Sequence, residues 1–317
     1  MPRRKVILDC DPGQDDAVAL FLAMSAPEEL DILGITAVAG NVPLDLTQRN
    51  ARMMCDLAGQ TELPVFGGCE QPMVRKAITA EFIHGDTGID GIGVFEPKTP
   101  LQEQHAVDFF VETLLRADKN SVTLVPTGPL TNIGTAIQRN PAILDGVEEI
   151  VLMGGAMRES GNRTPSAEFN IMVDPHAAEL VFDCGRPVTA MGLDVTHQVL
   201  STRARVGQIS ALANPVADAT AGMLSFFHRY DMKKYGAEGA PLHDPCTVAY
   251  LLKPELFESK MCNIAVETES ELTVGHTAVD FWHVTDRPAN ANWVFEIDAD
   301  GFFELLNEHL ARFGNRK

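Results

Sequence analysis

Positive charge is scarce in this sequence. Its 317 residues include 25 Lys and Arg against 44 Asp and Glu, which gives a formal net charge of −19. Surfaces that bind nucleic acid or anionic membranes need concentrated Lys and Arg, and no segment supplies them. We therefore expect no nucleic-acid partner and no membrane partner, and a small ligand should be neutral or cationic.

Long apolar runs and paired cysteines are also missing. The longest uninterrupted apolar run covers residues 17–24, which is far short of a membrane span. The apolar run of the basic N-terminus stops at Asp9, too early for a secretory signal. The six cysteines contain no Cys-x-x-Cys pair, which argues against a zinc site or a disulfide framework. A cytoplasmic protein with reduced thiols fits these features best.

No repeat, low-complexity tract or linker divides the chain, so we expect one domain over residues 1–317. Short runs rich in β-branched residues and Leu alternate with helix-like segments, a pattern typical of a parallel sheet with helices on both faces. The sequence thus predicts an α/β, doubly wound, mostly parallel fold. Expected strands cover residues 6–8, 32–39, 121–128, 149–155 and 187–194, and expected helices cover 16–24, 46–59 and 106–117.

The helix expected over residues 106–117 can be oriented from its pattern. Five apolar residues recur at helical spacing and should share one buried face. They are Val107, Phe110, Val111, Leu114 and Leu115. Beyond about residue 262 the pattern changes, because residues 263–281 predict an antiparallel hairpin and residues 291–313 predict a last strand and helix. We expect a small antiparallel addition at this end of the chain.

Residues 9–16, DCDPGQDD, concentrate carboxylates. Asp9, Asp11, Asp15 and Asp16 lie here without any Lys or Arg, at the expected carboxyl end of the first strand. Ligands of open parallel sheets bind beyond such strand ends. One interpretation is that Asp15 or Asp16 merely caps the following helix. The other is a hard-cation site, in which converging carboxylates suit Ca²⁺ better than Mg²⁺.

The acidic stretch is one of several ordered motifs that resemble a known family. The motifs are DCDPGQDDAVAL (9–20), AVAGN (37–41), IHGDTGIDG (83–91), LVPTGPLTNIG (124–134), VLMGGA (151–156), TPSAEFNIMVDPHAA (164–178), GLDVTHQ (192–198) and APLHDP (240–245). Together they are similar to the inosine–uridine-preferring nucleoside hydrolases over roughly residues 6–250. The run GAPLHDPCTVAYLLKPELF (239–257) is most similar to bacterial ribonucleoside hydrolases that prefer pyrimidines.

This resemblance implies a doubly wound core, a Ca²⁺ ion at the strand ends, assembly as a dimer or tetramer, and hydrolysis of an N-glycosidic bond to ribose and a free base. The implied metal ligands are the side chains of Asp11, Asp16 and Asp244 and the carbonyl oxygen of Thr127, whose side chain should matter little. Asp11 would also take a proton from the metal-bound water as general base. The alternative for Asp244 is a plain helix start at Asp244-Pro245.

The resemblance also assigns residues to the substrate. His243 would assist the departing base, because its ordinary pKa is near neutrality, although a lone histidine is more often structural. Asp15 and Asn170 would hold the secondary hydroxyls of ribose, with Asn41 near the water; for both asparagines a turn or cap is the alternative. The other implied contacts are Met153, Asn162 and Glu168 near the 5′-hydroxyl, Phe169 against the ribose, His84 in the base pocket and Tyr235 in a mobile lid.

Other interpretations stay open at this point. Asp9-Cys10-Asp11 superficially resembles the Mg²⁺-dependent haloacid-dehalogenase-like phosphatases, but Pro12-Gly13 does not continue that motif. A non-catalytic nucleoside-binding protein, or a hydrolase with purine or broad specificity, would carry the same motifs. A dinucleotide-dependent oxidoreductase is disfavoured because no Gly-x-Gly-x-x-Gly follows the first strand. The expected activity is ribonucleoside hydrolysis with a preference for uridine and cytidine.

Overall fold

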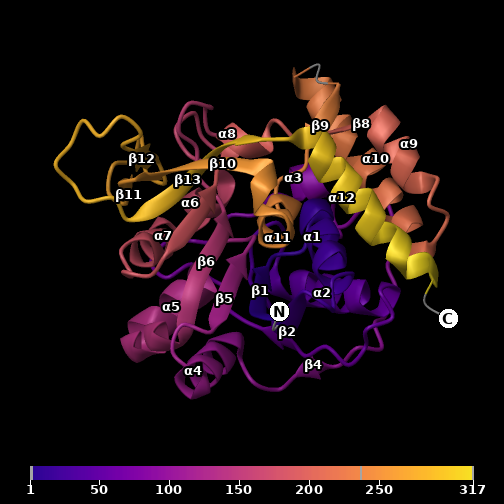
Figure 1. The fold of residues 1–317 in the computed structure, drawn as a ribbon, viewed down its shortest axis with the longest axis horizontal. Coiled ribbons are helices and arrows are strands. Elements are labelled where there is room, and N and C mark those ends of the chain that lie inside the picture. The colour runs from indigo at the N-terminus through magenta and orange to yellow at the C-terminus, as the bar shows by residue number, and fades with distance from the viewer. Residues whose placement is uncertain (1–2, 236–237, 316–317) are drawn as a thin grey trace.

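The computed structural model describes residues 3–235 and 238–315, and the side chains of all of these except residues 230–235 and 315. Nine strands form one sheet in the order β10-β13-β7-β6-β5-β1-β2-β3-β4 (Figure 1). Every neighbouring pair is parallel except β10 and β13, so the mostly parallel, doubly wound prediction is confirmed. The strands are β1 (Arg4–Cys10), β2 (Leu30–Ala37), β3 (Val65–Gly67), β4 (Leu101–Gln102), β5 (Val122–Pro126), β6 (Val147–Met153), β7 (Val188–Met191), β10 (Phe257–Cys262) and β13 (Ala291–Ile297).

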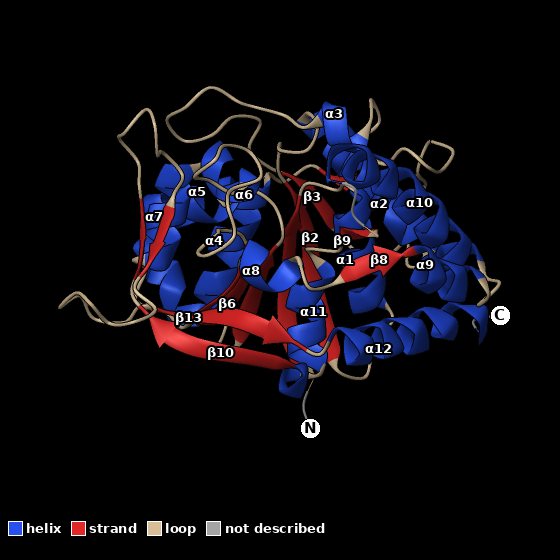
Figure 2. Ribbon diagram, turned by 90° about the horizontal axis from the view of Figure 1, so that it is seen from above, coloured by secondary structure: helices blue, strands red, loops and turns tan. Residues whose placement is uncertain are grey.

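Alternate residues of the central strands point to opposite faces of the sheet. On β1, Val6 and Leu8 pack into one hydrophobic cluster, whereas Ile7 packs into a second. Helices cover both clusters (Figures 1 and 2), so the strands are continuous apolar runs rather than alternating patterns. The first cluster contains residues of α1 (Gln14–Met24), α2 (Leu44–Leu57), α11 (Pro245–Leu252) and α12 (Ala299–Ala311), and the second contains residues of α4 (Ala106–Arg116), α5 (Thr131–Arg139) and α7 (Pro175–Phe182).

Helix α4 is present as expected, and Val107, Phe110 and Leu114 of its predicted face are buried, but the edge of that face differs. Leu115 is 48% exposed, whereas Phe109, which the pattern left out, is buried. Phe109 stacks on Phe66 of β3 with ring centroids 4.0 Å apart. It also occupies the space beside Gly34 of β2, where a β-carbon would collide with its ring. A glycine on a neighbouring strand thus makes room for an aromatic ring that helical spacing alone does not select.

The C-terminal prediction is confirmed, and the structure adds the position of the last strand. The expected hairpin is β11 (Ile264–Val266) with β12 (Thr277–Val279), which are antiparallel, and the last strand and helix are β13 and α12. However, β13 belongs to the main sheet, where it pairs in parallel with β7, and β10 pairs with its other edge. Local sequence patterns predict a strand without identifying its neighbours, so the position of β13 in the main sheet was not part of the prediction.

Further helices and a two-stranded ribbon complete the fold. They are α3 (Glu81–His84), α6 (Phe169–Val173), α8 (Leu193–Thr196), α9 (Arg203–Ser210), α10 (Pro215–Tyr235) and an antiparallel ribbon of β8 (Leu200–Thr202) with β9 (Gly239–Pro241). Among the described residues, no helix combines the length and the apolar character needed to cross a membrane.

Candidate functional site

The acidic stretch connects the carboxyl end of β1 to α1. Asp16, in the first turn of α1, accepts hydrogen bonds from the backbone N–H groups of Asp11 (3.3 Å) and Gly13 (3.0 Å). The contact with Gly13 caps the helix, so the capping interpretation holds for Asp16. It is not the whole role of this side chain, because the hydroxyl of Thr127 at the end of β5 donates to the same carboxylate at 2.7 Å. The Thr127 side chain, which was expected to matter little, therefore makes a direct contact with the acidic loop.

Asp11 is almost fully buried, with 1% of its surface exposed. Its Oδ2 accepts the backbone N–H of Asn41 at 2.7 Å, and its Oδ1 has no hydrogen-bond partner among the described residues. A β-carbon at Gly40 or at Gly128 would overlap this carboxylate, so both positions require glycine. The side-chain amide of Asn41 also donates to the Asp11 carbonyl and to the Asp16 carboxylate, each at 3.1 Å. Asn41 therefore connects two of the acidic residues.

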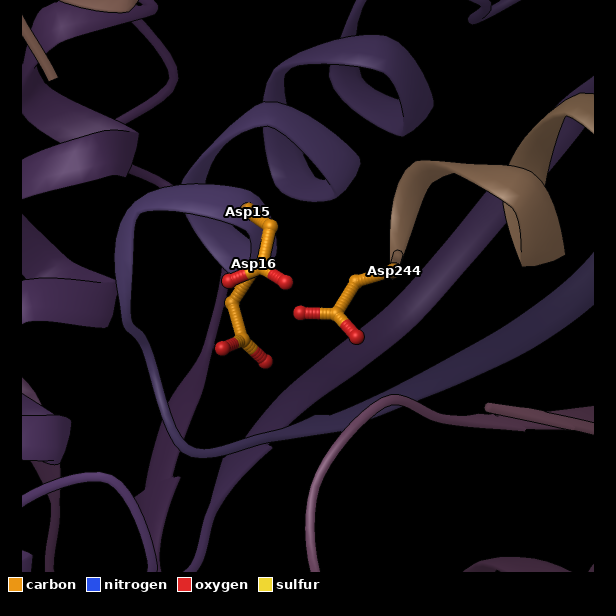
Figure 3. A group of neighbouring side chains, drawn as sticks. All are labelled: Asp15, Asp16 and Asp244. Carbon is orange, nitrogen blue, oxygen red and sulfur yellow. The ribbon is translucent and has the colours of Figure 1, made fainter. Parts of the chain in front are cut away.

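Asp244 reaches the acidic loop from the far end of the chain. Helix α11 begins at Pro245, as the helix-start alternative predicts, but the Asp244 side chain makes no capping hydrogen bond. Its carboxylate faces those of Asp15 and Asp16 (Figure 3), and one oxygen from each of the three lies within 4.8 Å of the others. Asp15 Oδ1 is also buried and has no hydrogen-bond partner in the described chain. Asp15, expected on the substrate, thus belongs to the converging group, whereas Asp11 is outside it.

Burial raises the pKa of all four carboxylates, and repulsion by neighbouring carboxylates adds to it for Asp11, Asp15 and Asp244. Burial, followed by the nearby Asp16 charge, raises the pKa of Asp15 to about 7 and raises that of Asp11 as well. Burial raises the pKa of Asp16, and burial with the Asp15 charge raises that of Asp244. A neighbouring cation would favour the ionised forms. Because the donors are all oxygens and two of those oxygens lack partners, these residues fit a hard divalent cation such as Ca²⁺ or Mg²⁺.

Asn170 links the ends of two central strands beside this cluster. Its amide donates to the carbonyl oxygens of Thr127 (2.7 Å) and Met153 (3.2 Å), at the ends of β5 and β6. Asn170 lies in α6, and 5% of its surface is exposed. Its side chain fixes the orientation of the Thr127 carbonyl, the backbone group that the resemblance places on the metal.

Glu168 is the N-cap of α6. Its carboxylate accepts the backbone N–H groups of Asn170 (2.9 Å) and Ile171 (3.2 Å), and also that of Gly155 (3.1 Å) after β6. Burial raises the pKa of Glu168 to about 7 despite these bonds. The side-chain oxygen of Asn162 accepts a hydrogen bond from the backbone N–H of Phe169 at 2.9 Å. Residues expected around the ribose therefore form one hydrogen-bonded wall.

Two histidines line the pocket, of which His84 is buried and His243 is half-buried. His84 Nδ1 is 2.7 Å from Gln14 Oε1, and its ring stacks against Phe227 with centroids 5.5 Å apart. His243 Nδ1 is 2.8 Å from the hydroxyl of Thr196. Burial lowers the pKa of His84 to about 3, and burial together with the charges of His197 and His84 lowers that of His243 to about 3. Both rings are therefore neutral near pH 7.

The low pKa of His84 predicts a specific acid sensitivity. The folded state keeps this ring neutral down to about pH 3, whereas the unfolded state takes up a proton below about pH 6.5, so stability falls as the pH drops below 6.5. Between about pH 7.5 and 4.5, we expect wild type to lose about 3 kcal/mol more of its free energy of unfolding than His84→Gln. Urea unfolding at a series of pH values measures this difference. The exposed His283→Gln should follow wild type, and parallel curves for all three proteins would contradict the prediction.

These groups line one pocket at the strand ends. Its wall includes eleven of the expected residues, namely Asp15, Asn41, His84, Thr127, Met153, Asn162, Glu168, Phe169, Asn170, His243 and Asp244. Asp11 and Asp16 are buried and are not part of the wall. The side chain of Tyr235 lies outside the described residues. Sequence reasoning did not assign five further wall residues to the site, namely Ala80, Phe82, Ile83, Arg163 and Phe227. Ile83 is the first residue of the His84 motif and Phe82 directly precedes it, so this motif is the signal that could have pointed to both.

Comparisons with known proteins agree with this geometry. A family model described as "Inosine-uridine preferring nucleoside hydrolase" matches residues 6–304. The chain belongs to this family. The nucleoside hydrolase is 47% identical over 311 residues to the pyrimidine-specific ribonucleoside hydrolase RihA of Photobacterium profundum, covering 98% of this chain and 99% of the relative. It is 48% identical over 309 residues to RihA of a Shewanella species, covering 97% and 96%.

A solved structure extends the comparison to the fold. The purine-preferring ribonucleoside hydrolase from Gardnerella vaginalis superposes with a TM-score of 0.90 at 33% identity, covering 98% of this chain and 99% of that one. Membership of the nucleoside hydrolase family replaces the phosphatase, oxidoreductase and non-catalytic alternatives. The names of the relatives divide between pyrimidines and purines, so the family by itself does not determine the preferred base.

Proposed function

We propose that this nucleoside hydrolase cleaves the N-glycosidic bond of ribonucleosides with a preference for uridine and cytidine, using Asp11 as general base and Ca²⁺ as cofactor. The supporting observation is the convergence of the Asp15, Asp16 and Asp244 carboxylates beside a pocket whose wall includes Asp15, Asp244 and His243. The pyrimidine preference rests on the two RihA relatives, which are named pyrimidine-specific and are 47% and 48% identical to this chain.

The cation would be held by Asp11, Asp16 and Asp244 together with the carbonyl oxygen of Thr127. When bound, such an ion lowers the pKa of a coordinated water by several units. The chain's contribution is to orient the ligands in advance. Asn170 donates a hydrogen bond to the Thr127 carbonyl, and the Thr127 hydroxyl donates one to the Asp16 carboxylate. These two bonds would keep both ligand oxygens in place before the cation binds.

Asp11 would accept the proton of the attacking water. Its two oxygens have different environments, because Asn41 fixes Oδ2 and no described residue bonds to Oδ1. A carboxylate with one fixed and one open oxygen is suited to positioned proton transfer. The reaction also builds positive charge on the ribose ring, as in other glycoside hydrolysis. The neighbouring carboxylate of Asp15, which lines the pocket, would stabilise that charge.

His243 would assist the departing base as a neutral ring. When the Thr196 hydroxyl donates to Nδ1, the ring proton resides on Nε2, the nitrogen that remains free to donate to the base. The depressed pKa of His243 keeps this state populated at neutral pH. His84 and Phe227 stack on each other in the pocket wall. They would form a surface against which the base packs, without transferring a proton to it.

The ribose contacts predict discrimination against 2′-deoxyribonucleosides. Asp15 and Asn170 would hold the secondary hydroxyls, and a substrate that lacks the 2′-hydroxyl leaves a buried polar group unpaired. We expect kcat/KM for 2′-deoxyuridine to be about 10–100-fold below that for uridine, the range for one lost hydrogen bond to a charged group. Steady-state rates on the two substrates measure the ratio. Asp15→Ala should shrink it, and equal kcat/KM values in wild type would refute the assignment.

The base preference can be tested directly. Purified enzyme with Ca²⁺ is incubated with uridine, cytidine, inosine and adenosine, and free base and ribose are quantified. We expect kcat/KM to be higher for both pyrimidine nucleosides than for both purine nucleosides. A purine that is turned over faster than uridine would overturn the pyrimidine preference while leaving nucleoside hydrolysis intact.

A further inference from the structure

A groove between α9 and α10 lies apart from the pocket at the strand ends. The two helices lie side by side (Figures 1 and 2), and the groove between them has a volume of about 580 Å³. No described residue lines both this groove and the pocket at the strand ends. Small side chains leave the space open, and a β-carbon at Gly207 would meet no atom within 4 Å. The groove is therefore a second cavity with its own lining.

The described wall of the groove carries more positive than negative charge. Arg203 and Arg229 line it, and Asp218 is its one acidic residue. This balance contrasts with the whole chain, whose net charge is −19. The Arg229 side chain is held in place, because its Nε donates to the Phe226 carbonyl at 3.2 Å and its guanidinium lies over the Phe226 ring, 3.8 Å from the centroid. A local excess of arginine on an acidic protein favours an anionic ligand.

His228 is a buried polar side chain of this groove that lacks a partner. Only 7% of its surface is exposed, and both ring nitrogens are buried without a hydrogen-bond partner among the described residues. A neutral imidazole has one N–H donor and one acceptor, and buried polar atoms of both kinds are almost always paired. Burial, followed by the Arg203 charge, lowers the pKa of His228, so the guanidinium acts on the ring. Arg203 and His228 thus belong to one polar cluster, which a ligand would complete.

The chemistry of these groups indicates the ligand. Guanidinium groups are planar forks of N–H donors that match phosphate oxygens. A phosphate that keeps one proton can also both accept from and donate to an imidazole ring. We propose that the groove is a second binding site, which holds a phosphate group between Arg203, Arg229 and His228. The volume exceeds what a phosphate alone would fill, so the ligand is free phosphate or a small phosphate ester.

This site would share a helix with the pocket at the strand ends. Phe227 of α10 lines that pocket, and the next residue, His228, lines the groove. Gly222, also in the groove wall, packs against the loop that follows His84, where a β-carbon at Gly91 would collide with the Gly222 carbonyl oxygen. A bound phosphate would join α9 to α10 and so hold the helix that carries Phe227. The inference rests on the groove alone and does not depend on the proposed reaction.

Isothermal titration calorimetry measures binding to the groove. The full-length, Ca²⁺-loaded enzyme, freed of excess Ca²⁺, is titrated with inorganic phosphate at constant ionic strength, with potassium chloride as the blank. We expect saturable binding in the low millimolar range. Arg203 is exposed, and Arg203→Gln should weaken binding about tenfold or more, which corresponds to one lost charge-assisted contact. Asp218→Asn removes the opposing carboxylate and should strengthen binding about twofold.

Two matched arginine variants separate the groove from other sites. Arg163→Gln removes a charge from the wall of the pocket at the strand ends, and Arg158→Gln removes an exposed charge that lies over the Phe281 ring. Both should leave the affinity for phosphate unchanged. An equal loss of affinity in Arg163→Gln and Arg203→Gln would overturn the inference. So would an unchanged affinity in Arg203→Gln, or no saturable binding to wild type.

Two further measurements identify the ligand and test for a protein partner. Glycerol 3-phosphate is titrated in parallel with inorganic phosphate. Tighter binding of the ester assigns the groove to a phosphate ester, weaker binding assigns it to free phosphate, and either result supports the site. Light scattering then compares the molecular masses of wild type and Arg203→Gln, which should be equal. A change in mass would show that a second copy of the chain covers the groove, and it would overturn the inference.

Discussion

Replacing Asp11 by Asn should reduce kcat by about 10²–10⁴-fold while leaving the fold intact. The amide is nearly isosteric with the carboxylate and can still accept the Asn41 N–H through its oxygen, so the buried contact that fixes this side chain survives. What is lost is the ability to accept a proton from water. Steady-state kinetics on uridine measure the effect, and circular dichroism with thermal unfolding establishes that the variant is folded.

Two controls separate a general base from a metal ligand. Activity of Asp11→Asn should stay low at saturating Ca²⁺, since a ligand defect would be relieved by more metal whereas a missing base would not. Asp218→Asn removes one exposed carboxylate on α10, outside the pocket wall, and should retain wild-type rates. Near-wild-type turnover of Asp11→Asn would show that another group takes the proton.

Removing the divalent cation should reduce kcat by about 10³-fold or more, and it should also lower the melting temperature. Without a cation, the buried Asp11, Asp15, Asp16 and Asp244 carboxylates must either repel one another or take up protons. A ligand that binds only the folded state at about 1,000 times its Kd adds about 4 kcal/mol to the free energy of unfolding. Dialysis against a chelator, followed by titration with Ca²⁺ or Mg²⁺, measures rate and melting temperature together.

The ion and its ligands can be checked in the same experiment. Ca²⁺ should restore activity at lower concentration than Mg²⁺, because a multi-carboxylate cage suits the larger ion. Asp244→Asn should need more Ca²⁺ and gain less thermal stability from it. Full activity in enzyme shown by elemental analysis to be free of metal would refute the proposed role of the cation.

The acidic part of the site was predictable because most of its carboxylates lie within one short stretch of the sequence. The spacing of Asp11, Asp15 and Asp16 after an apolar run places carboxylates at a strand end, and that end is where parallel sheets bind ligands. Asp244 could be assigned only through the resemblance, since nothing local shows that a residue before α11 packs against α1. The Thr127 hydroxyl was missed for the same reason: its partner, Asp16, lies on a distant segment.

The apolar and cationic parts of the pocket were not predictable from local pattern. Phe227 comes from the middle of α10, where an aromatic residue at helical spacing is ordinarily part of the core, and it meets His84 only through tertiary packing. Arg163 lies in a turn, where a charged residue is usually solvated. On α4, Phe109 is buried although the pattern predicted Leu115, and the cause is similar: Phe109 stacks on the ring of Phe66, which lies on the distant strand β3.

The placement of β13 between β7 and β10 has a consequence for synthesis of the protein. While the ribosome is still adding residues before 291, the β7 edge has no strand to pair with, although the strands on its other side are already complete. The sheet can therefore be completed only after nearly the whole polypeptide has emerged from the ribosome. Premature termination upstream of that strand would leave an open, aggregation-prone edge, so quality control should degrade such fragments rather than release them as smaller working enzymes.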